Sequence, residues 1–222
     1  MHSKKPVEKP YTRPENRALA LRTCNADLTS HGGFQWPESG HVEAPDWNEK
    51  PACGGGLHGL LWGEGSGSYL SWEESAKWLL VEVDPALVVW IGGDKVKFPR
   101  GKVVFCGDRG AALEFLSANT DNPSRVCVGK TATAWYRGTA TAGYRGTATA
   151  GHRGTATAGD SGTATAGDSG TATAGYSGII TIRWWDGKKE RYRIAVGYVG
   201  EGGIEANTAY CVENGMLKKI EK

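Results

Sequence analysis

The most regular pattern of polar and apolar positions lies in the second half of the chain, where threonine and alanine alternate in blocks of eight residues. From Gly138 the sequence reads GTATAGYR, GTATAGHR, GTATAGDS, GTATAGDS and GTATAGYS. Degenerate copies flank this run, KTATAWYR at 130–137 and GIITIRWW at 178–185. Alternation with a period of two predicts one strand in each block. The Gly-x-x-Gly between blocks predicts a corner, because glycine tolerates the positive φ that a tight reversal needs.

One block supplies a strand and a corner, so two blocks are needed to close a coil. We therefore expect a β-solenoid at 129–182 with two flat parallel sheets, in which stacked strands lie about 4.8 Å apart. In the last copy the two alanine positions become Ile180 and Ile182. Larger apolar groups are expected inside a terminal rung, which indicates that the alanines face inward and the threonines outward. A core of alanine buries little apolar area, so both ends should need caps.

The C-terminal cap is expected to be an antiparallel β unit over residues 183–222. Asp186-Gly187 and Asn214-Gly215 are typical of hairpin turns. The run at 191–199 predicts a strand with Ile194, Val196 and Tyr198 on one face. We expect Trp184 and Trp185 to pack on the end of the solenoid.

The N-terminal region, residues 17–128, predicts an α+β domain, and the polar, proline-containing segment 1–16 predicts a flexible leader. Apolar runs predict strands at 18–23, 40–44, 57–62, 79–83, 87–91, 95–98 and 102–105, the last two flanking a turn at 99–101. Ser71-Trp72-Glu73-Glu74 matches a capping box, which predicts a short helix through Trp78. Asp108 is the expected cap of a second helix over 110–117.

Charge and cysteine content narrow the classes of function. The net charge is +2, with 26 basic and 24 acidic residues, so we expect no nucleic-acid partner. No apolar run approaches ~18 residues, so no membrane span is expected. Five cysteines without a C-x-x-C pair indicate reduced thiols and a cytoplasmic location.

The outward threonines form two columns, one beginning at Thr131 and one at Thr133, so each sheet should display a flat T-x-T array. Here the repeat resembles the repeats of bacterial ice-nucleation proteins. That resemblance implies ice binding through the threonine arrays. The alternative is that threonine serves only as a good solvent-facing strand residue.

The corner residues vary in an ordered way. With two blocks per coil, one edge should carry Tyr136, His152 and Asp168, and the other should carry Tyr144, Asp160 and Tyr176. Exposed tyrosine and arginine are favoured contact residues. The sequence therefore predicts a partner-binding edge made of Tyr136, Arg137, Tyr144, Arg145, His152 and Arg153. Flat threonine faces can also pair in a two-fold homodimer, and the sequence leaves monomer and dimer open.

A second candidate site is the stretch Cys53-Gly-Gly-Gly-Leu57-His58. Glycines beside a histidine can let the backbone approach a ligand, so Cys53, Gly55 and His58 are candidates for a ligand pocket. The spacing matches no zinc pattern, and the glycines lack the Gly-Lys-Ser/Thr ending of a phosphate loop. Since no orienting third residue accompanies Cys53 and His58, we assign no catalytic residue, metal or cofactor.

The segments GGFQWP at 32–37, GGGLH at 54–58 and KVKFPRGKVVFCGD at 95–108 resemble a domain found in bacteriophage and prophage proteins, in which Ala/Thr/Gly octapeptide repeats follow. The resemblance implies a phage-derived protein that binds a host bacterial protein or inhibits a host defence system. Arg22-Thr23 followed by Gly-Leu-His also resembles ADP-ribosyltransferases, although no catalytic Glu-x-Glu is present.

Three functions thus stand for test. The first is a non-enzymatic interaction protein with a rigid solenoid as its contact or oligomerisation surface. The second is an enzyme with a site around Cys53 and His58. The third is an ice-binding protein that acts through its T-x-T arrays.

Overall fold

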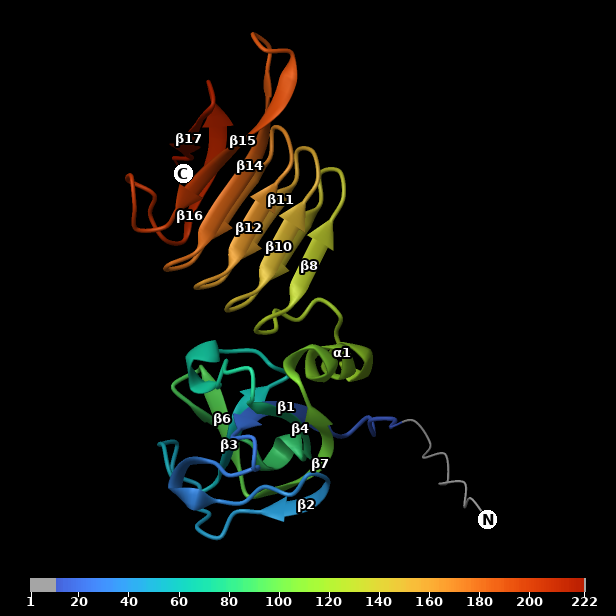
Figure 1. Cartoon of the computed structure of the whole chain (residues 1–222). Coiled ribbons are helices and arrows are strands. Elements are labelled where there is room, and N and C mark those ends of the chain that lie inside the picture. The colour runs from blue at the N-terminus through green and yellow to red at the C-terminus, as the bar shows by residue number, and fades with distance from the viewer. Residues whose placement is uncertain (1–10, 222) are drawn as a thin grey trace. The chain divides into compact units, whose positions relative to one another are not determined.

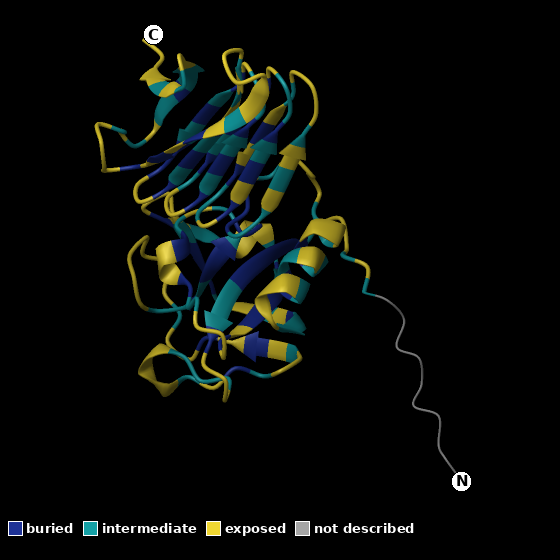
Figure 2. Ribbon diagram, turned by 45° about the horizontal axis from the view of Figure 1, so that its top comes forward, coloured by how far each residue is buried: buried dark blue, intermediate teal, exposed yellow. Residues whose placement is uncertain are grey.

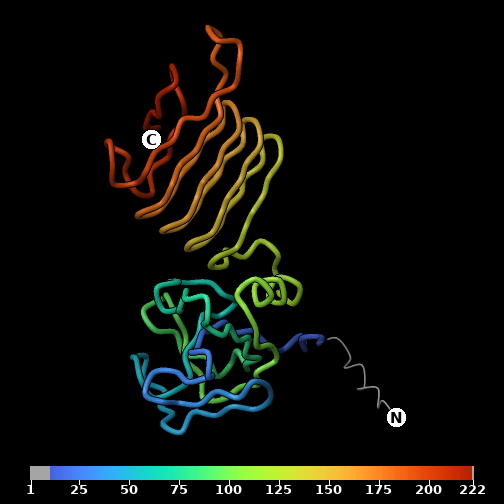
Figure 3. The backbone as a smooth tube through the Cα atoms, in the orientation of Figure 1, coloured from blue at the N-terminus to red at the C-terminus, as the bar shows by residue number. Residues whose placement is uncertain are grey.

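The computed structural model describes residues 11–221, which divide into two compact units. The first unit comprises residues 11–62 and 71–123, and the second comprises residues 63–70 and 124–221. The chain passes from the first unit to the second twice, after residue 62 and again after residue 123. Figure 3 shows the course of the backbone, coloured by residue number.

The first unit is built on a seven-stranded antiparallel sheet with strand order β2-β7-β4-β1-β3-β6-β5. Its strands are β1 (Ala18–Cys24), β2 (Gly40–Glu43), β3 (Leu57–Leu61), β4 (Lys77–Val83), β5 (Val89–Ile91), β6 (Lys95–Phe98) and β7 (Arg100–Gly107). Three short helical elements accompany it: 3₁₀ turns at His31–Gly33 and Pro85–Leu87, and the α-helix α1 (Arg109–Asn119). The whole unit is therefore β-rich with a single α-helix.

The centre of this sheet is its most apolar part. In β1 and β4, the side chains of Leu19, Leu21, Leu79 and Leu80 are completely buried. Burial on both faces explains why these strands read as continuous apolar runs rather than as alternating ones. Helix α1 packs against β4 and β7 of the sheet, and its own Leu116 side chain is buried in that contact.

Segment 71–78 is not a helix, so the prediction from its capping box was wrong. The backbone N–H of Ser71 donates to Thr23 Oγ1 at 2.7 Å, and Lys77 already begins β4. Trp78 is buried in that central strand and contacts Trp72 edge-on. Pairing of β4 with β1 and β7 satisfies the backbone and buries apolar side chains, which outweighs a local helix signal.

The other local predictions in this unit were closer. Asp108 caps α1, because its Oδ1 accepts a hydrogen bond from the Ala111 N–H at 2.9 Å. The expected strand at 87–91 begins only at Val89, since Pro85–Leu87 forms a 3₁₀ turn. The strands on either side of Pro99 do not pair with each other: β6 pairs with β3, and β7 with β4.

The expected flexible leader at 1–16 is described only from residue 11 onward, and there it is docked on the first unit. The Tyr11 hydroxyl donates to Glu82 at 2.7 Å, and its ring stacks on Phe115 of α1 at 5.2 Å. Arg13 Nε donates to the Asn119 carbonyl. An aromatic ring gains buried contact area by packing on α1 in this way, and the flexibility of the leader stays a prediction.

The second unit is a β-solenoid with two blocks of eight residues per coil, as predicted. One sheet contains the parallel strands β8 (Thr131–Ala134), β10 (Thr147–Ala150), β12 (Thr163–Ala166) and β14 (Ile179–Asp186). The other contains β9 (Thr139–Ala142), β11 (Thr155–Ala158) and β13 (Thr171–Ala174). Equivalent residues of stacked strands pair in register, Thr147 with Thr163 for example. The stacked rungs are visible in Figure 1.

The interior of the solenoid is made of alanine. Ala148, Ala156, Ala164 and Ala172 are completely buried, and Ile180 joins them at the last full rung. The threonines between them are exposed or half-buried. This alternation of buried and accessible residues is visible along the strands in Figure 2 and confirms the predicted orientation.

The corners differ from the prediction. The positive φ lies on the second residue between the two glycines, for example 56° at Arg137, 57° at Arg153 and 57° at Ser169. The flanking glycines are instead needed for space: a Cβ on Gly167 would lie 2.6 Å from the carbonyl carbon of Gly151 in the neighbouring coil. Close approach of backbones, rather than glycine's conformational freedom, therefore selects glycine here.

The C-terminal end of the solenoid is covered by two hairpins, as expected. Strand β15 (Arg191–Tyr198) pairs with β14, and β16 (Thr208–Glu213) pairs with β13 and with β17 (Met216–Lys219). Tyr210 is buried in the same core cluster as Ile180 and Ile182, and Ile204 and Leu217 pack against it.

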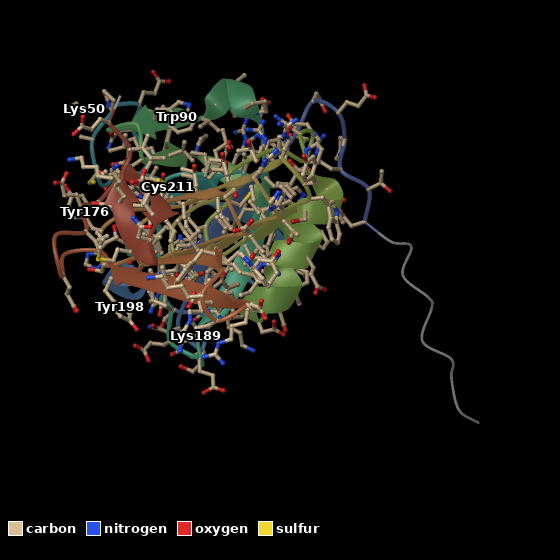
Figure 4. All side chains as sticks on the ribbon, turned by 90° about the horizontal axis from the view of Figure 1, so that it is seen from above. Lys50, Trp90, Tyr176, Lys189, Tyr198 and Cys211 are labelled. Carbon is tan, nitrogen blue, oxygen red and sulfur yellow. The ribbon has the colours of Figure 1, made fainter. Side chains whose placement is uncertain are left out.

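The two tryptophans do not cap the core, which corrects the prediction. The Trp184 ring packs beside Gly215 of the β16–β17 turn. Trp185 is 49% exposed, and its ring contacts the Tyr192 ring edge-on. Ile194, Val196 and Tyr198 share one face of β15, and that face is exposed. Tyr198, labelled in Figure 4, is 53% exposed. The smaller Ile204, Tyr210 and Leu217 fill the end of the alanine core in their place.

At the N-terminal end of the solenoid, segment 63–70 packs within the second unit although it lies between β3 and β4 in the sequence. The Val128 N–H donates to the Gly63 carbonyl at 2.9 Å, and Arg125 pairs with Glu64 at 2.6 Å. This segment contains the 3₁₀ turn Gly67–Tyr69, and Gly67 lies directly against the ring of Tyr144. Within residues 11–221 no helix is long and apolar enough to cross a bilayer.

Candidate functional site

The outer surfaces of the two solenoid sheets each carry a T-x-T array. We call these the first and second threonine faces. The first face comprises Thr131, Thr133, Thr147, Thr149, Thr163, Thr165 and Thr181. The second face comprises Thr139, Thr141, Thr155, Thr157, Thr171 and Thr173.

The spacing of these threonines follows from strand geometry. Threonines two apart on one strand are separated by about 6.7 Å, and equivalent threonines on stacked strands by about 4.8 Å. No charged side chain interrupts the faces within the TATA strands. Each face therefore presents a rectangular lattice of hydroxyl and methyl groups.

The threonine side chains are well restrained. Threonine is branched at Cβ, which limits its side-chain rotamers. Thr181 Oγ1 and Thr165 Oγ1 are 2.8 Å apart and hydrogen-bonded across two rungs. Rungs in strict register repeat the same backbone conformation, so the threonine positions recur at the rung spacing.

The corner residues expected to stack do so on one edge. The rings of Tyr136 and His152 are stacked with centroids 5.7 Å apart, and His152 Nδ1 lies 3.3 Å from Asp168 Oδ2. Arg137 and Arg153 lie beside this column and are exposed.

The opposite edge is built differently. Tyr144 is half-buried against Gly67, and Arg145 follows it at the corner. Asp160 Oδ1 accepts a hydrogen bond from the Tyr176 N–H at 2.9 Å instead of stacking with it. The six residues chosen from the sequence therefore divide between two edges, four on the column of Tyr136 and two on the column of Tyr144.

In the first unit, Cys53, Gly55 and His58 line one pocket of about 780 Å³. The loop at 54–56 and β3 bring them there. Cys53 is an exposed free thiol, and His58 is half-buried. Arg22, Phe34, Trp36 and Lys95 line the same pocket. From the sequence, Arg22 had been singled out only through the resemblance to ADP-ribosyltransferases, and the other three had not been predicted to line a pocket.

Arg22 is the most unusual residue of this pocket. Its Cζ lies 3.8 Å from the centre of the Trp36 ring, and its terminal nitrogens donate to the carbonyls of His58 and Thr23. Its Nε is buried and lacks a hydrogen-bond partner. Burial lowers the pKa of Arg22 to about 10. The signal in the sequence was a lone arginine in the apolar run ALALRTC.

His58 lies beside this arginine in an environment that disfavours its charge. Burial lowers the pKa of His58 most, and the charges of Lys95, Lys97 and Arg22 lower it further. Its Nε2 is buried and also lacks a partner. In the part of the chain that the structure describes, no group of three His, Cys, Asp or Glu side chains could hold a metal ion.

Comparison with known proteins gives two kinds of match. A family model described as a domain of unknown function, DUF7666, matches residues 18–117. The chain is also similar to ice nucleation proteins: 41% identical over 110 residues to one from Pseudomonas syringae, 39% over 104 residues to one from Xanthomonas campestris pv. translucens, and 40% over 103 residues to InaU from Pantoea ananas. No solved structure gives a significant match.

The extent of these matches is partial. The aligned segments cover 49%, 46% and 46% of this chain, but only 10%, 7% and 10% of the three relatives. The chain thus has homologues among the ice nucleation proteins, and it matches about a tenth or less of their length.

Proposed function

We propose that the solenoid binds ice through its threonine faces. The observation that carries this proposal is the in-register T-x-T lattice on two flat sheets, with seven threonines over four rungs on the first face and six over three rungs on the second. The similarity of the chain to ice nucleation proteins supports it.

The chemistry of the faces suits a crystalline ligand. A threonine offers one donor hydroxyl with two lone pairs and one methyl group. The hydroxyls can hydrogen-bond to water next to such a surface. The methyl groups form no hydrogen bonds with that water, so it keeps its hydrogen bonds to other water molecules. Because the rungs repeat at a fixed spacing, ordered water on the face would repeat at that spacing as well.

The structure also favours a rigid face. The alanine core allows the two sheets to approach closely, and every rung hydrogen-bonds to the rung before and after it. The ordering of water therefore requires little loss of side-chain or backbone freedom at the moment of binding.

The size of the faces predicts the kind of activity. Four stacked strands on the first face span about 14 Å between the outer two, and three on the second face span about 10 Å. An ice embryo must exceed a critical size before it grows, and a patch of this size can template only a small one. We therefore propose adsorption to existing ice as the main activity, with weak nucleation of new ice.

The test is the shape of single ice crystals growing in solutions of the full chain. Thr149→Lys combined with Thr165→Lys puts two charges in the middle of the first face, and Thr157→Lys puts one in the second. The matched control for the single substitution Thr157→Lys is Ser169→Lys. It also adds one positive charge, but at a corner where Arg153 occupies the equivalent position of the preceding coil.

Faceted crystals with the native chain and the control, and round crystals with the face variants, would support ice binding. Round crystals with the native chain would refute it, as would faceting that survives substitution of both faces at once.

A second function is favoured by the exposed corner column. Tyr136 is 60% exposed and stacked on His152, with Arg137 and Arg153 beside it. We propose this edge as a contact surface for a protein partner, a host bacterial protein or a second copy of the chain. Alanine at Tyr136, Arg137, His152 and Arg153 together should then abolish the interaction or change the sedimentation coefficient. No change in either would rule out the edge.

A further inference from the structure

Two cationic side chains of the first unit, the completely buried Lys97 and the half-buried Arg22, lie beside the same pocket without an acidic partner. Lys97 is completely buried, and its Nζ donates to Asn48 Oδ1 and to the Gly54 carbonyl, each at 3.1 Å. Arg22 donates only to backbone carbonyls. Among residues 11–221 neither side chain forms an ion pair with a carboxylate.

Such an arrangement is costly for a free protein. A buried charge loses its hydration, and a neutral carbonyl or amide returns less energy than an opposite charge would. The partnerless Nε of Arg22 adds the cost of an unmade hydrogen bond. Both costs would fall if an anion occupied the space beside Arg22.

The remaining walls of the pocket have the same electrostatic sign. Lys95 lines it together with Arg22, whereas Asp46 is the single acidic group in its lining. Asp46 Oδ1 already accepts a hydrogen bond from the Gly56 N–H. The local field therefore favours a negative ligand.

The pocket is also prepared to hold a group with a defined orientation. Stacking on Trp36 fixes the plane of the Arg22 guanidinium. A guanidinium in a fixed plane can donate two parallel hydrogen bonds to a carboxylate or a phosphate. Phe34, which contacts Trp36 edge-on at 5.4 Å, supplies an apolar wall.

The glycines of the pocket wall are held in place by the second buried cation. Lys97 binds the Gly54 carbonyl, and the Trp47 ring lies 3.0 Å from where a Cβ of Gly56 would be. Gly55 is packed against Asn48 in the same way. The loop at 54–56 is therefore a fixed backbone wall rather than a lid.

We propose that this pocket binds a small organic anion, carrying a phosphate or a carboxylate, with Arg22 as its principal charge contact and His58 Nε2 as a second polar contact. The volume of about 780 Å³ fits a molecule of nucleotide size better than a bare inorganic anion. This function belongs to the first unit and is independent of ice binding by the solenoid.

The experiment is isothermal titration calorimetry on the full chain with four probes: adenosine monophosphate, citrate, adenosine and inorganic phosphate. Saturable binding of adenosine monophosphate or citrate, with much weaker binding of adenosine, is the expected result. Adenosine monophosphate and citrate distinguish a phosphate ligand from a carboxylate ligand. Binding of adenosine as tight as that of its monophosphate, or no binding of either organic anion, would overturn the proposal.

Variants locate the site. Arg22→Gln should weaken the Kd of the binding anion at least about tenfold, which is the loss of one charged hydrogen bond. Arg109→Gln is the matched control, because Arg109 also lies over a tryptophan, Trp72, but outside this pocket. An unchanged Kd in Arg22→Gln would refute the assignment. If circular dichroism shows that Arg22→Gln is unfolded, His58→Gln replaces it, with the same two outcomes.

Discussion

Glycine at the solenoid corners is explained by the backbone of the neighbouring coil. Gly151 lies directly over Trp135, so a Cβ on Gly151 would be 2.9 Å from the carbonyl carbon of residue 135. Trp135 occupies the equivalent position one coil earlier, where it belongs to the first rung. With no earlier rung beneath it, a side chain is tolerated, and Trp135 is 84% exposed. The departure KTATAW from the repeat is thus a consequence of position in the stack.

The first prediction concerns such a glycine. Gly167→Ala should destabilise the chain by about 1–3 kcal/mol, because its methyl group would lie 2.6 Å from backbone of the neighbouring coil. Urea unfolding measures the change. Gly110→Ala is the control, since nothing closer than 3.4 Å meets its Cβ and it lies in α1, where alanine is favoured. Equal stability of Gly167→Ala and the native chain would contradict this account of the corners.

The second prediction concerns pH. Because the folded state lowers the pKa of His58, the unfolded chain binds the proton more readily. The contribution of His58 to stability is therefore complete above its unfolded pKa of about 6.5 and is lost as the pH falls toward the folded pKa.

The measurement compares the free energy of unfolding at pH 7.5 and at pH 5 for the native chain and for His58→Gln. The native chain should lose more stability between these conditions than the variant. His31→Gln is the control, because His31 is exposed in the same pocket. A variant that loses as much stability as the native chain would show that His58 does not titrate in this range.

At the scale of elements, the local sequence of the repeat was enough to predict the solenoid, whereas local patterns were not enough to predict every element of the N-terminal unit. Each octad contains its strand, its corner and the identity of its inward residues, so periodicity alone predicted the two-sheet solenoid. In the first unit, segment 71–78 has a local helix signal but forms the approach to β4, whose partners β1 and β7 lie far away in sequence. Long-range pairing of this kind cannot be read from a local pattern.

The candidate pocket shows the same limit. Cys53, Gly55 and His58 were found because they are adjacent in sequence. The place of Arg22 beside them did not follow from residue spacing, because β1 brings Arg22 to the pocket through its pairing with β3, where it donates to the His58 carbonyl. The replacement of Trp184 and Trp185 by Tyr210 and Leu217 in the solenoid cap has a similar origin, since β16 and β17 reach the core from the end of the chain.

The third prediction tests the cap as an element. Ile182→Ala should cost about 2–5 kcal/mol, because it leaves a cavity at the last rung of a core that has little other apolar area. Ile194→Ala is the matched control: Ile194 lies on β15 and is 67% exposed, so its truncation should change stability by less than about 0.5 kcal/mol. Similar effects of the two substitutions in urea unfolding would contradict the assignment of Ile182 to the core.

At the scale of the whole molecule, the chain combines a short solenoid with a separate β-rich unit that matches a domain of unknown function. The aligned part of the chain matches a tenth or less of the ice nucleation proteins, and the solenoid's threonine faces span only four and three rungs. Activity toward ice should therefore depend on the number of coils rather than on any single threonine.

The most direct test of that claim is the ice affinity of a series of chains with different numbers of coils. Removing residues 146–161, or duplicating 154–169, changes the stack by one complete coil of sixteen residues and keeps both threonine faces in register. The measured quantity is the fraction of folded protein taken up by a slowly growing ice hemisphere. We predict that uptake rises from the shortened chain to the native chain to the lengthened chain. Equal uptake by all three, at the level of a protein excluded from ice, would contradict ice binding by the threonine faces.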